Sequence, residues 1–309
     1  MTALPVGASV TVEVPATSAN LGPGFDCFGL ALSWRERVEL AVIDDGYVVE
    51  VSGEGAADVP RDETHLILTS ALQGLADLGR SVPGLRLRCH NTIPHGRGLG
   101  SSSAAIVAGL LAARGLDGGP REEKDEVQRW LLQHASRIEG HPDNVAAAIY
   151  GGFVLVWAGA QGLEVVTSEV HPEVGAVVFV PNTPVATKAA RNLLPAVVPH
   201  QHAARNAART ALLVHALSQD PERLLDGTAD WLHQDYRRPA MPESWALMQR
   251  LRGQGLAAVI SGAGPTVLAL GRPADLAAAA DNQPGFRRVS VGIGAGASVL
   301  AEPERTNEK

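Results

Sequence analysis

The sequence is poor in cysteine, in aromatic residues and in positive charge. Its two cysteines, Cys27 and Cys89, are too few for a disulfide framework or a thiolate metal site, and they indicate a reducing compartment, the cytoplasm. The 26 Lys and Arg residues against 33 Asp and Glu give a net charge of −7, which offers no basic surface for a nucleic acid. No run approaches the ~18 uninterrupted apolar residues of a membrane span. We therefore expect neither nucleic acid nor membrane as a partner.

The amino-terminal residues 1–14 also lack the basic and apolar regions of a signal peptide, in keeping with a cytoplasmic protein. A length of 309 residues favours two domains at roughly 150 residues each. We place the boundary between residues 1–170 and 171–309, and expect disorder in the tail from Glu302.

Alternating and periodic apolar residues predict an α+β protein. The expected strands lie at 10–14, 38–42, 47–51, 85–89, 153–157, 175–180, 256–260, 266–270 and 287–291. The expected helices lie at 64–78, 122–138, 142–149, 200–217 and 243–252. Pro15 is expected to end the first strand at Val14, and a polar loop to follow it.

The most informative stretch is residues 94–104, Pro-His-Gly-Arg-Gly-Leu-Gly-Ser-Ser-Ser-Ala. It follows a predicted strand, and an Ala/Leu/Val run after it predicts a helix to Ala113 that ends at Gly115. Glycines let the backbone turn tightly, and the hydroxyls begin a helix whose free N–H groups and positive dipole end suit phosphate. A serine there can also bind Mg²⁺. The plainer alternative is a turn followed by a helix cap, which the strand and helix on either side disfavour.

Three common motifs are missing at this loop. It has no Gly-Lys-Ser/Thr of a Walker A loop, no G-x-G-x-x-G spacing and no G-x-S-x-G nucleophile elbow. Instead, residues 98–105 resemble the phosphate-binding loop of the superfamily of galactokinase, homoserine kinase, mevalonate kinase and phosphomevalonate kinase. The resemblance assigns ATP binding to Pro94, His95, Gly96, Arg97, Gly98, Leu99, Gly100, Ser101, Ser102, Ser103 and Ala104.

Two further segments resemble motifs of the same superfamily. Residues 15–26, with Asn20 and Asp26 in a Gly-Pro loop, resemble the first motif in its homoserine kinase form, and these two side chains can hold an ammonium or hydroxyl group. Residues 261–266 resemble the third motif, in which Gly262 and Gly264 close beside the phosphates. Each segment alone is also typical of an ordinary turn. Their order along the chain favours the superfamily.

The segment Glu139-Gly-His-Pro-Asp-Asn-Val145 resembles homoserine kinases rather than the sugar and isoprenoid branches. The resemblance implies that His141 and Asn144 contact homoserine, and that Glu139 with Ser102 holds Mg²⁺. Asp143 lies near the base of mevalonate-type members and is our candidate catalytic base, the alternative acceptor of the hydroxyl proton being a phosphate oxygen. A helix break with an Asp cap would explain the same residues without any function.

An amino-acid substrate needs a cation for its carboxylate, ideally a guanidinium. Thr187 and Arg191 lie four residues apart in a segment that resembles the family's substrate-binding helix, and Arg237, chosen over Arg238, lies in a second such segment. Any single Arg is more often a solvated surface residue. Substrate positioning by these groups is the expected main source of rate, so Arg191 is also counted as catalytic.

Together, these resemblances span residues 14–266 and imply a two-domain kinase. The implied fold is an amino-terminal ribosomal protein S5 domain 2-like domain and a carboxy-terminal ferredoxin-like domain. The implied reaction is ATP-dependent phosphorylation of the L-homoserine side-chain hydroxyl to O-phospho-L-homoserine in threonine biosynthesis, by a homodimer. The alternatives are a kinase of the superfamily acting on mevalonate, shikimate or a sugar alcohol, and a non-catalytic regulator that binds a nucleotide or amino acid on the same fold.

Overall fold

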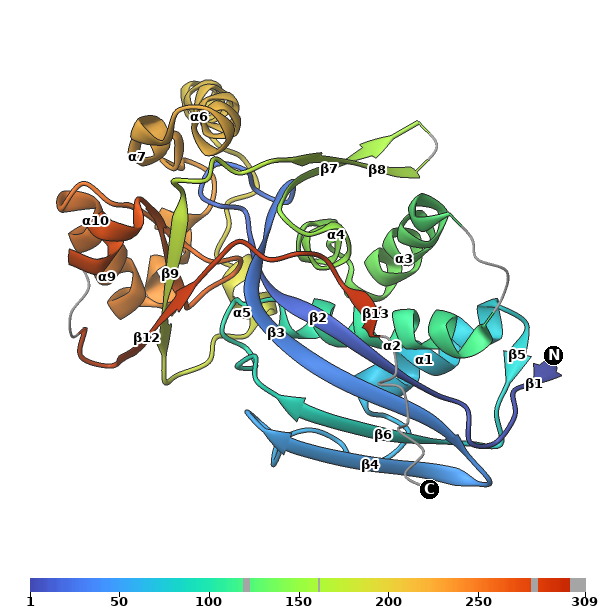
Figure 1. Ribbon diagram of the computed structural model, residues 1–309. Helices are drawn as coiled ribbons and strands as arrows, with labels where there is room; N and C mark the ends of the chain where they lie inside the picture. Colours follow the sequence, from blue (N-terminus) through green and yellow to red (C-terminus); the bar gives the residue numbers. More distant parts are fainter. Residues whose placement is uncertain (119–122, 161, 279–282, 301–309) are drawn as a thin grey trace.

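The computed structural model describes residues 1–118, 123–160, 162–278 and 283–300 and shows two units packed side by side (Figure 1). The expected disordered tail from Glu302 lies outside the described residues. Among the described helices, none is both long and apolar enough to cross a membrane.

The amino-terminal unit is built on a large twisted sheet. Its strands run in the order β13-β2-β3-β6-β4, with β7 pairing with both β3 and β8. The β4–β6 pair is parallel and the other pairs are antiparallel. The strands are β2 (Ser9–Ala19), β3 (Phe28–Ile43), β4 (Gly46–Gly53), β6 (Gly84–Asn91), β7 (Phe153–Gly159), β8 (Gly162–Ser168) and β13 (Ser298–Leu300). A small parallel pair joins β1 (Thr2–Ala3) to β5 (Arg80–Ser81).

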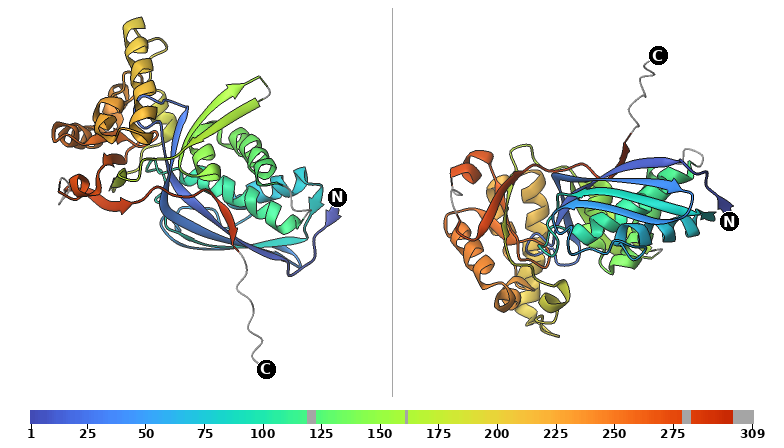
Figure 2. Two further views of the ribbon diagram at one scale, coloured as in Figure 1. Left: turned by 45° about the horizontal axis from the view of Figure 1, so that its top comes forward. Right: turned by 90° about the horizontal axis from the view of Figure 1, so that it is seen from below.

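Helices cover one face of this sheet, as both views in Figure 2 show. They are α1 (Leu66–Asp77), α2 (Ser101–Asp117), α3 (Lys124–Glu139) and α4 (Pro142–Tyr150). Alternate residues of the strands, such as Val12, Val38 and Leu40, are fully buried beneath them. The opposite face carries ion pairs such as Arg88 with Glu50. One apolar and one charged face explain why period-two alternation identified these strands.

Two predicted element ends were wrong, and the strand predicted at 38–42 begins ten residues earlier, at Phe28. Strand β2 continues through Pro15 to Ala19, because the pairing register with β3 shifts between Pro15 and Thr17 and a proline is tolerated at such a bulge. Helix α2 continues past Gly115 to Asp117, where Gly118 at φ 57° caps it. A Cβ at Gly115 would come within 2.6 Å of Val10, so this glycine permits close packing of α2 on β2 and does not end the helix.

The carboxy-terminal unit has a four-stranded antiparallel sheet in the order β10-β11-β9-β12. Its strands are β9 (Gly175–Pro181), β10 (Ala257–Ile260), β11 (Val267–Gly271) and β12 (Phe286–Val291). Its helices are α5 (Thr187–Arg191), α6 (His200–Ser218), α7 (Leu224–Gly227), α8 (Gln234–Arg237), α9 (Pro242–Gly253) and α10 (Pro273–Ala278), with 3-10 turns η1 (Pro221–Arg223) and η2 (Arg238–Ala240). Strand order and connections are those of a ferredoxin-like fold, as expected.

The last described strand returns to the amino-terminal unit. Strand β13 pairs with β2, and isolated bridges join Ile293 to Leu32 and Ala295 to Gly151. The division at residue 170 falls between β8 and β9 and stays a prediction, although residues 293–300 lie against the first unit. Both ends of the carboxy-terminal unit are therefore tied to the large sheet, which fixes the junction where the predicted site residues meet.

Candidate active site

A cavity of about 270 Å³ lies where the amino-terminal end of α2, the loop between β2 and β3, and the carboxy-terminal unit meet. Its walls contain all the residues predicted to bind the substrate, namely Asn20, Asp26, His141, Asn144, Thr187, Arg191 and Arg237. The predicted nucleotide and metal residues in its walls are Gly96, Gly98, Gly100, Ser101, Ser102, Gly262 and Glu139. Residues that are far apart in sequence are thus brought to one place.

The glycine loop has the backbone that its composition predicts. Gly96, Gly98 and Gly100 have φ values of 63°, 74° and 67°, in the left-handed region that favours glycine. Gly100 is the N-cap of α2, so the N–H groups of Ser101 to Ser103 have no carbonyl four residues earlier within the helix. A 17-residue helix thereby directs its positive end into the cavity.

The third motif, residues 261–266, is hydrogen-bonded to this loop and forms a clasp over it. Ser261 Oγ lies 2.5 Å from the carbonyl oxygen of Gly98 and 2.8 Å from Ser18 Oγ. The N–H of Thr266 donates to the carbonyl of Arg97 at 3.1 Å, and the N–H of Gly262 donates to the carbonyl of Ala19 at 3.1 Å. The predicted residue Gly264 has φ 86° and lies outside the cavity, where it shapes the turn. The three motifs therefore form one hydrogen-bonded unit.

Replacing Gly98 with Ala should raise the KM for ATP at least about tenfold, because a Cβ here would collide with the carbonyl oxygens of Ser261 and Gly264 and would occupy the left-handed region. Steady-state kinetics with ATP varied would measure this. Gly46→Ala is the matched control, because Gly46 has a similar φ of 71° and nothing within 4 Å of its added Cβ. Equal effects of the two variants would contradict the role given to the clasp.

Arg97 ties the loop to the carboxy-terminal unit. Its guanidinium donates to the carbonyls of Pro181 at 2.9 Å and His95 at 3.0 Å, and also to that of Asn182. Burial lowers the pKa of Arg97. Because these carbonyls already engage the guanidinium, its contact with a nucleotide stays a prediction. Pro94 and Leu99 are buried beneath the loop, and Ala104 and Ser103 lie inside the first turns of α2.

Glu139, the last residue of α3, reaches the start of α2. Ser102 Oγ donates to Glu139 Oε1 at 2.6 Å and Ser103 Oγ at 3.0 Å. In the part of the chain that the structure describes, no group of three or more His, Cys, Asp and Glu side chains could hold a metal by itself. A carboxylate beside a hydroxyl nevertheless fits Mg²⁺, which usually binds through one or two carboxylates together with nucleotide phosphates.

The loop between β2 and β3 is strained and cross-linked. Asn20, Leu21 and Asp26 have φ values of 69°, 50° and 56°, which are uncommon for residues other than glycine and which concentrate at functional sites. Asn20 Oδ1 accepts the N–H of Asp26 at 2.9 Å, and its Nδ2 donates to the carbonyl of Gly262 at 3.0 Å. Asn20 thus lines the cavity while its amide holds the loop closed. Its predicted contact with a substrate can use the second Oδ1 lone pair or the second Nδ2 hydrogen, which these two bonds leave free.

Two arginines enter the cavity from the carboxy-terminal unit. Arg191, on α5, forms a bidentate ion pair with Asp26, with N···O distances of 2.7 and 3.1 Å. Arg237, on α8, is 1% exposed, and burial, with Arg191 as a second cause, lowers its pKa to about 10. It therefore stays protonated at neutral pH. Arg238 instead lies 4.9 Å from the ring of Trp245, which supports the choice of Arg237.

The predicted substrate segment lies at the start of α4. His141 precedes the helix, and burial followed by the charge of Arg191 lowers its pKa, which favours the neutral ring. Asp143 is 3% exposed, and burial raises its pKa from 3.8 to about 7. Asn144 Oδ1 accepts from Thr17 Oγ1 at 2.8 Å, which orients the amide toward the cavity that both Asn144 and Asp143 line.

A second cavity of about 240 Å³ adjoins the first and was not predicted from the sequence. Ser101 and Ser102 line both cavities, and the second is otherwise lined largely by apolar and ring groups such as Val59, Pro60 and His65. The predicted nucleotide residue His95 lines it too, and burial lowers the pKa values of His65 and His95 toward neutral rings. The sequence signal was weak, because these residues come from separate strands, helices and loops of the amino-terminal unit.

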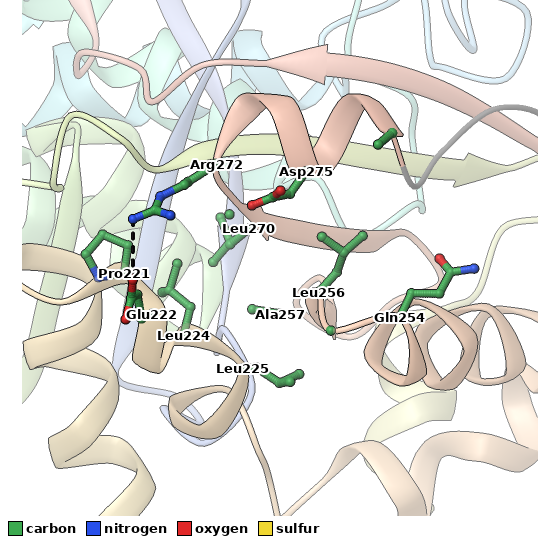
Figure 3. A pocket seen from close by; sticks show the side chains of 13 residues that line it. Pro221, Glu222, Leu224, Leu225, Gln254, Leu256, Ala257, Leu270, Arg272 and Asp275 are labelled. Atoms are coloured by element: carbon green, nitrogen blue, oxygen red, sulfur yellow. Dashed lines mark ion pairs between the residues drawn. The ribbon is translucent and has the colours of Figure 1, made fainter.

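A third cavity, of about 530 Å³, lies in the carboxy-terminal unit between α7, α9 and α10 (Figure 3). Arg272 on its rim pairs with Glu222 at 3.6 Å and with Glu173 at 3.1 Å, so its charge is already balanced. None of the residues predicted for the site lines this cavity within the described ranges. The larger hollow is therefore not where the predicted chemistry converges.

Comparison with known proteins places this arrangement in a family. The model of the GHMP kinase amino-terminal domain matches residues 65–152, and that of the GHMP kinase carboxy-terminal domain matches residues 211–283. Together they cover about half of the chain and include the glycine loop. The chain belongs to the GHMP kinase family.

Its relatives narrow the class further. The chain is 54% identical over 263 residues to homoserine kinase of Streptomyces coelicolor, covering 85% of this chain and 84% of that protein. It is 45% identical over 306 residues to homoserine kinase of Rhodococcus erythropolis, covering 96% of this chain and 97% of that protein. The crystal structure of homoserine kinase from Cytophaga hutchinsonii aligns with a TM-score of 0.80 at 27% identity, and the alignment covers 96% of this chain and 98% of that one. These similarities confirm the predicted two-domain kinase fold and the resemblance to homoserine kinases.

Proposed function

We propose that the protein transfers the γ-phosphate of ATP to the side-chain hydroxyl of L-homoserine and yields O-phospho-L-homoserine. One observation carries the proposal: the positive end of α2 and the guanidinium groups of Arg191 and Arg237 line the same small cavity. A phosphate donor and a carboxylate-bearing acceptor can be held there together. The identity of 45–54% to homoserine kinases over most of the chain supports the same substrate.

The nucleotide is assigned to the two adjoining cavities. The free N–H groups of Ser101 to Ser103 would bind the phosphates, and the apolar second cavity would take the base. Glu139 and Ser102 would hold Mg²⁺, which supplies neutralisation of the phosphate charge when bound. The chain itself contributes the helix end and the fixed loop, which are already arranged to stabilise negative charge without reorganisation.

Homoserine is assigned to the first cavity. The arginines would bind its carboxylate, because a guanidinium matches two oxygens with parallel hydrogen bonds. Asp26 would bind the ammonium group, while His141, Asn144 and Thr187 line the remaining wall near the hydroxyl. Arg191 and Arg237 carry two positive charges and Asp26 one negative charge, which suits a substrate that has both a carboxylate and an ammonium group.

The hydroxyl proton has two possible acceptors, Asp143 and a phosphate oxygen. With a pKa of about 7, the Asp143 carboxyl is protonated in about half of the molecules at neutral pH, and those molecules cannot take up a proton. We therefore assign most of the rate to positioning, with Asp143 as an auxiliary acceptor. Where Asp143 is already protonated, the hydroxyl proton passes to an oxygen of the phosphoryl group that is being transferred.

Replacing Asp143 with Asn should reduce kcat by no more than about tenfold and should make folding stability less dependent on pH. The folded wild type binds this proton more tightly than the unfolded chain, so its stability falls as pH rises between about 4 and 7. The variant lacks this loss. The difference in melting temperature, variant minus wild type, should therefore be roughly 2–4 °C larger at about pH 8 than at about pH 5.

Asparagine keeps the acceptor that Oδ1 of Asp143 offers to the N–H of Asn144, so this substitution changes the charge more than the geometry. Thermal unfolding and kcat, each measured across this pH range, provide the two readouts. A loss of kcat of a hundredfold or more, with the pH dependence of kcat abolished, would instead make Asp143 the essential base.

A coupled ADP-release assay tests the proposed reaction. Homoserine should be turned over with ATP far better than serine, threonine, shikimate or mevalonate. Mevalonate carries a carboxylate but no ammonium, so Asp26 is the group that should discriminate against it. Turnover of mevalonate without turnover of homoserine would refute the substrate, and binding without ADP release would favour the non-catalytic regulator.

We further propose that the enzyme is a cytoplasmic homodimer that acts in threonine biosynthesis. Both cysteines are free, which suits a reducing cytoplasm. A homodimer and a role in threonine biosynthesis rest on the resemblance to homoserine kinases. Light scattering of the purified protein should give about twice the 32.3 kDa of one chain, and a value near that of one chain would refute the dimer.

A further inference from the structure

Phe25 lies beside both arginines and does not itself line the cavity. Its ring centre is 5.4 Å from the guanidinium carbon of Arg191 and 5.4 Å from that of Arg237. Both distances are within the roughly 6 Å over which an aromatic face attracts a cation. The ring of His233 lies 5.3 Å from that of Phe25, at an angle of 35°. One aromatic side chain therefore contacts every cation proposed to bind the substrate carboxylate.

The two arginines need such a partner. The Nε atom of each is buried and has no hydrogen-bond partner among the described residues. Because these atoms have almost no accessible surface, a ligand in the cavity cannot reach them, and the adjacent aromatic ring offsets part of the cost of burying the two guanidinium groups. The two positive charges also repel each other, and Asp26 balances only one of them. The ring of Phe25 offsets part of the remaining cost of holding them together.

Arg237 is fixed from its other side by His233. Its Nη1 donates to His233 Nδ1 at 3.1 Å and to the carbonyl of Gly262 at 3.1 Å. Since an arginine only donates, Nδ1 must be the unprotonated nitrogen, so Nε2 carries the hydrogen and donates to the carbonyl of Gly22 at 2.8 Å. His233 is fully buried and thus holds Arg237 against the same loop that carries Phe25.

Phe25 itself is held in place by its loop. Its neighbour Asp26 is fixed through Asn20, and the carbonyl of Pro23 accepts hydrogen bonds from Asn206 at 2.8 Å and Thr210 at 3.1 Å, both on α6. The ring is therefore a rigid surface on which flexible arginine side chains can rest. Fixing the arginines before binding reduces the conformational entropy that carboxylate binding must overcome.

We propose that Phe25 is a positioning residue that holds Arg191 and Arg237 at one spacing for the substrate carboxylate, and so sets the preference for an amino acid over an amino alcohol. This inference rests on the proposed homoserine kinase reaction. Leucine fills a similar space without an aromatic face, and tyrosine keeps the face.

The test compares two substrates that differ only in the carboxylate, homoserine and 3-aminopropan-1-ol. In Phe25→Leu, the ratio of their kcat/KM values should fall about tenfold from the wild-type ratio, through a higher KM for homoserine, with the KM for ATP unchanged. Phe25→Tyr should restore the ratio. If turnover of the amino alcohol is too slow to measure, its inhibition constant against homoserine replaces its kcat/KM.

Phe28→Leu is the control for general loosening, because Phe28 begins β3 directly after this loop and packs edge-on against Phe153, with 5.1 Å between the ring centres. An unchanged ratio in Phe25→Leu, or an equal fall in Phe28→Leu, would overturn the inference. Thermal unfolding of each variant serves to check that it is folded. If the wild type fails to phosphorylate homoserine, the proposed reaction is wrong, and that result is distinct from a failure of Phe25 alone.

Discussion

Replacing Arg191 with Ala should raise the KM for homoserine about 10- to 100-fold while the KM for ATP stays within about twofold. A charge-assisted bidentate contact with a carboxylate contributes enough binding energy for that change. Arg191, on α5, lines the first cavity, which we assign to homoserine, and it does not line the second cavity, which we assign to the nucleotide base. The effect should therefore be confined to one substrate. Initial rates with each substrate varied in turn would measure it.

Two variants control this experiment. Lys188→Ala removes a positive charge from the same helix at an exposed position, and it should leave both KM values unchanged. Arg191→Lys keeps the charge but loses the fork, so it should recover only part of the loss. Equal increases in both KM values for Arg191→Ala would show that the residue supports the whole site rather than the carboxylate.

Replacing Glu139 with Gln should lower kcat about 100-fold, an effect that excess Mg²⁺ should reduce. The amide keeps the size of the side chain and an oxygen that accepts hydrogen bonds from Ser102 and Ser103. It removes the negative charge with which, in our assignment, Glu139 binds Mg²⁺. Loss of one charge-stabilising group at a reaction centre typically costs this much. The dependence of kcat on Mg²⁺ concentration, at saturating ATP and homoserine, is the measurement.

Glu126→Gln provides the matched control, because Glu126 is exposed on the same helix α3. It should leave kcat and the Mg²⁺ dependence unchanged. If Glu139→Gln lowered kcat without altering the Mg²⁺ dependence, Glu139 would act by fixing Ser102 and Ser103, and the metal would have to be held elsewhere.

Local chemistry made the motifs and most of their elements predictable from the sequence. The glycine loop requires left-handed backbone at alternate positions, which glycine alone provides easily, and the hydroxyls that follow mark the helix start. Thr187 and Arg191 share a helix as their spacing indicated. These features depend on neighbours within a few residues, so they can be recognised before any tertiary structure is known.

The features that could not be predicted depend on contacts between distant segments. Gly115 looked like a helix end, but Val10 on β2 decides its role. Pro15 looked like a strand end, but a bulge against β3 accommodates it. The pairing of Asp26 with Arg191, 165 residues away, and the contacts of Phe25 with both arginines arise only when the two units pack. The second cavity likewise combines residues from separate strands, helices and loops, here within the amino-terminal unit.

We place the phosphates of ATP at the amino-terminal end of α2, opposite a homoserine held by Arg191 and Arg237. A crystal structure with Mg²⁺, a non-hydrolysable ATP analogue and homoserine tests this placement most directly. We expect phosphate oxygens at the N–H groups of Ser101 to Ser103, and the homoserine carboxylate at the two guanidinium groups. Phosphates bound elsewhere, such as at Arg272 in the larger cavity, with the end of α2 left empty, would contradict it.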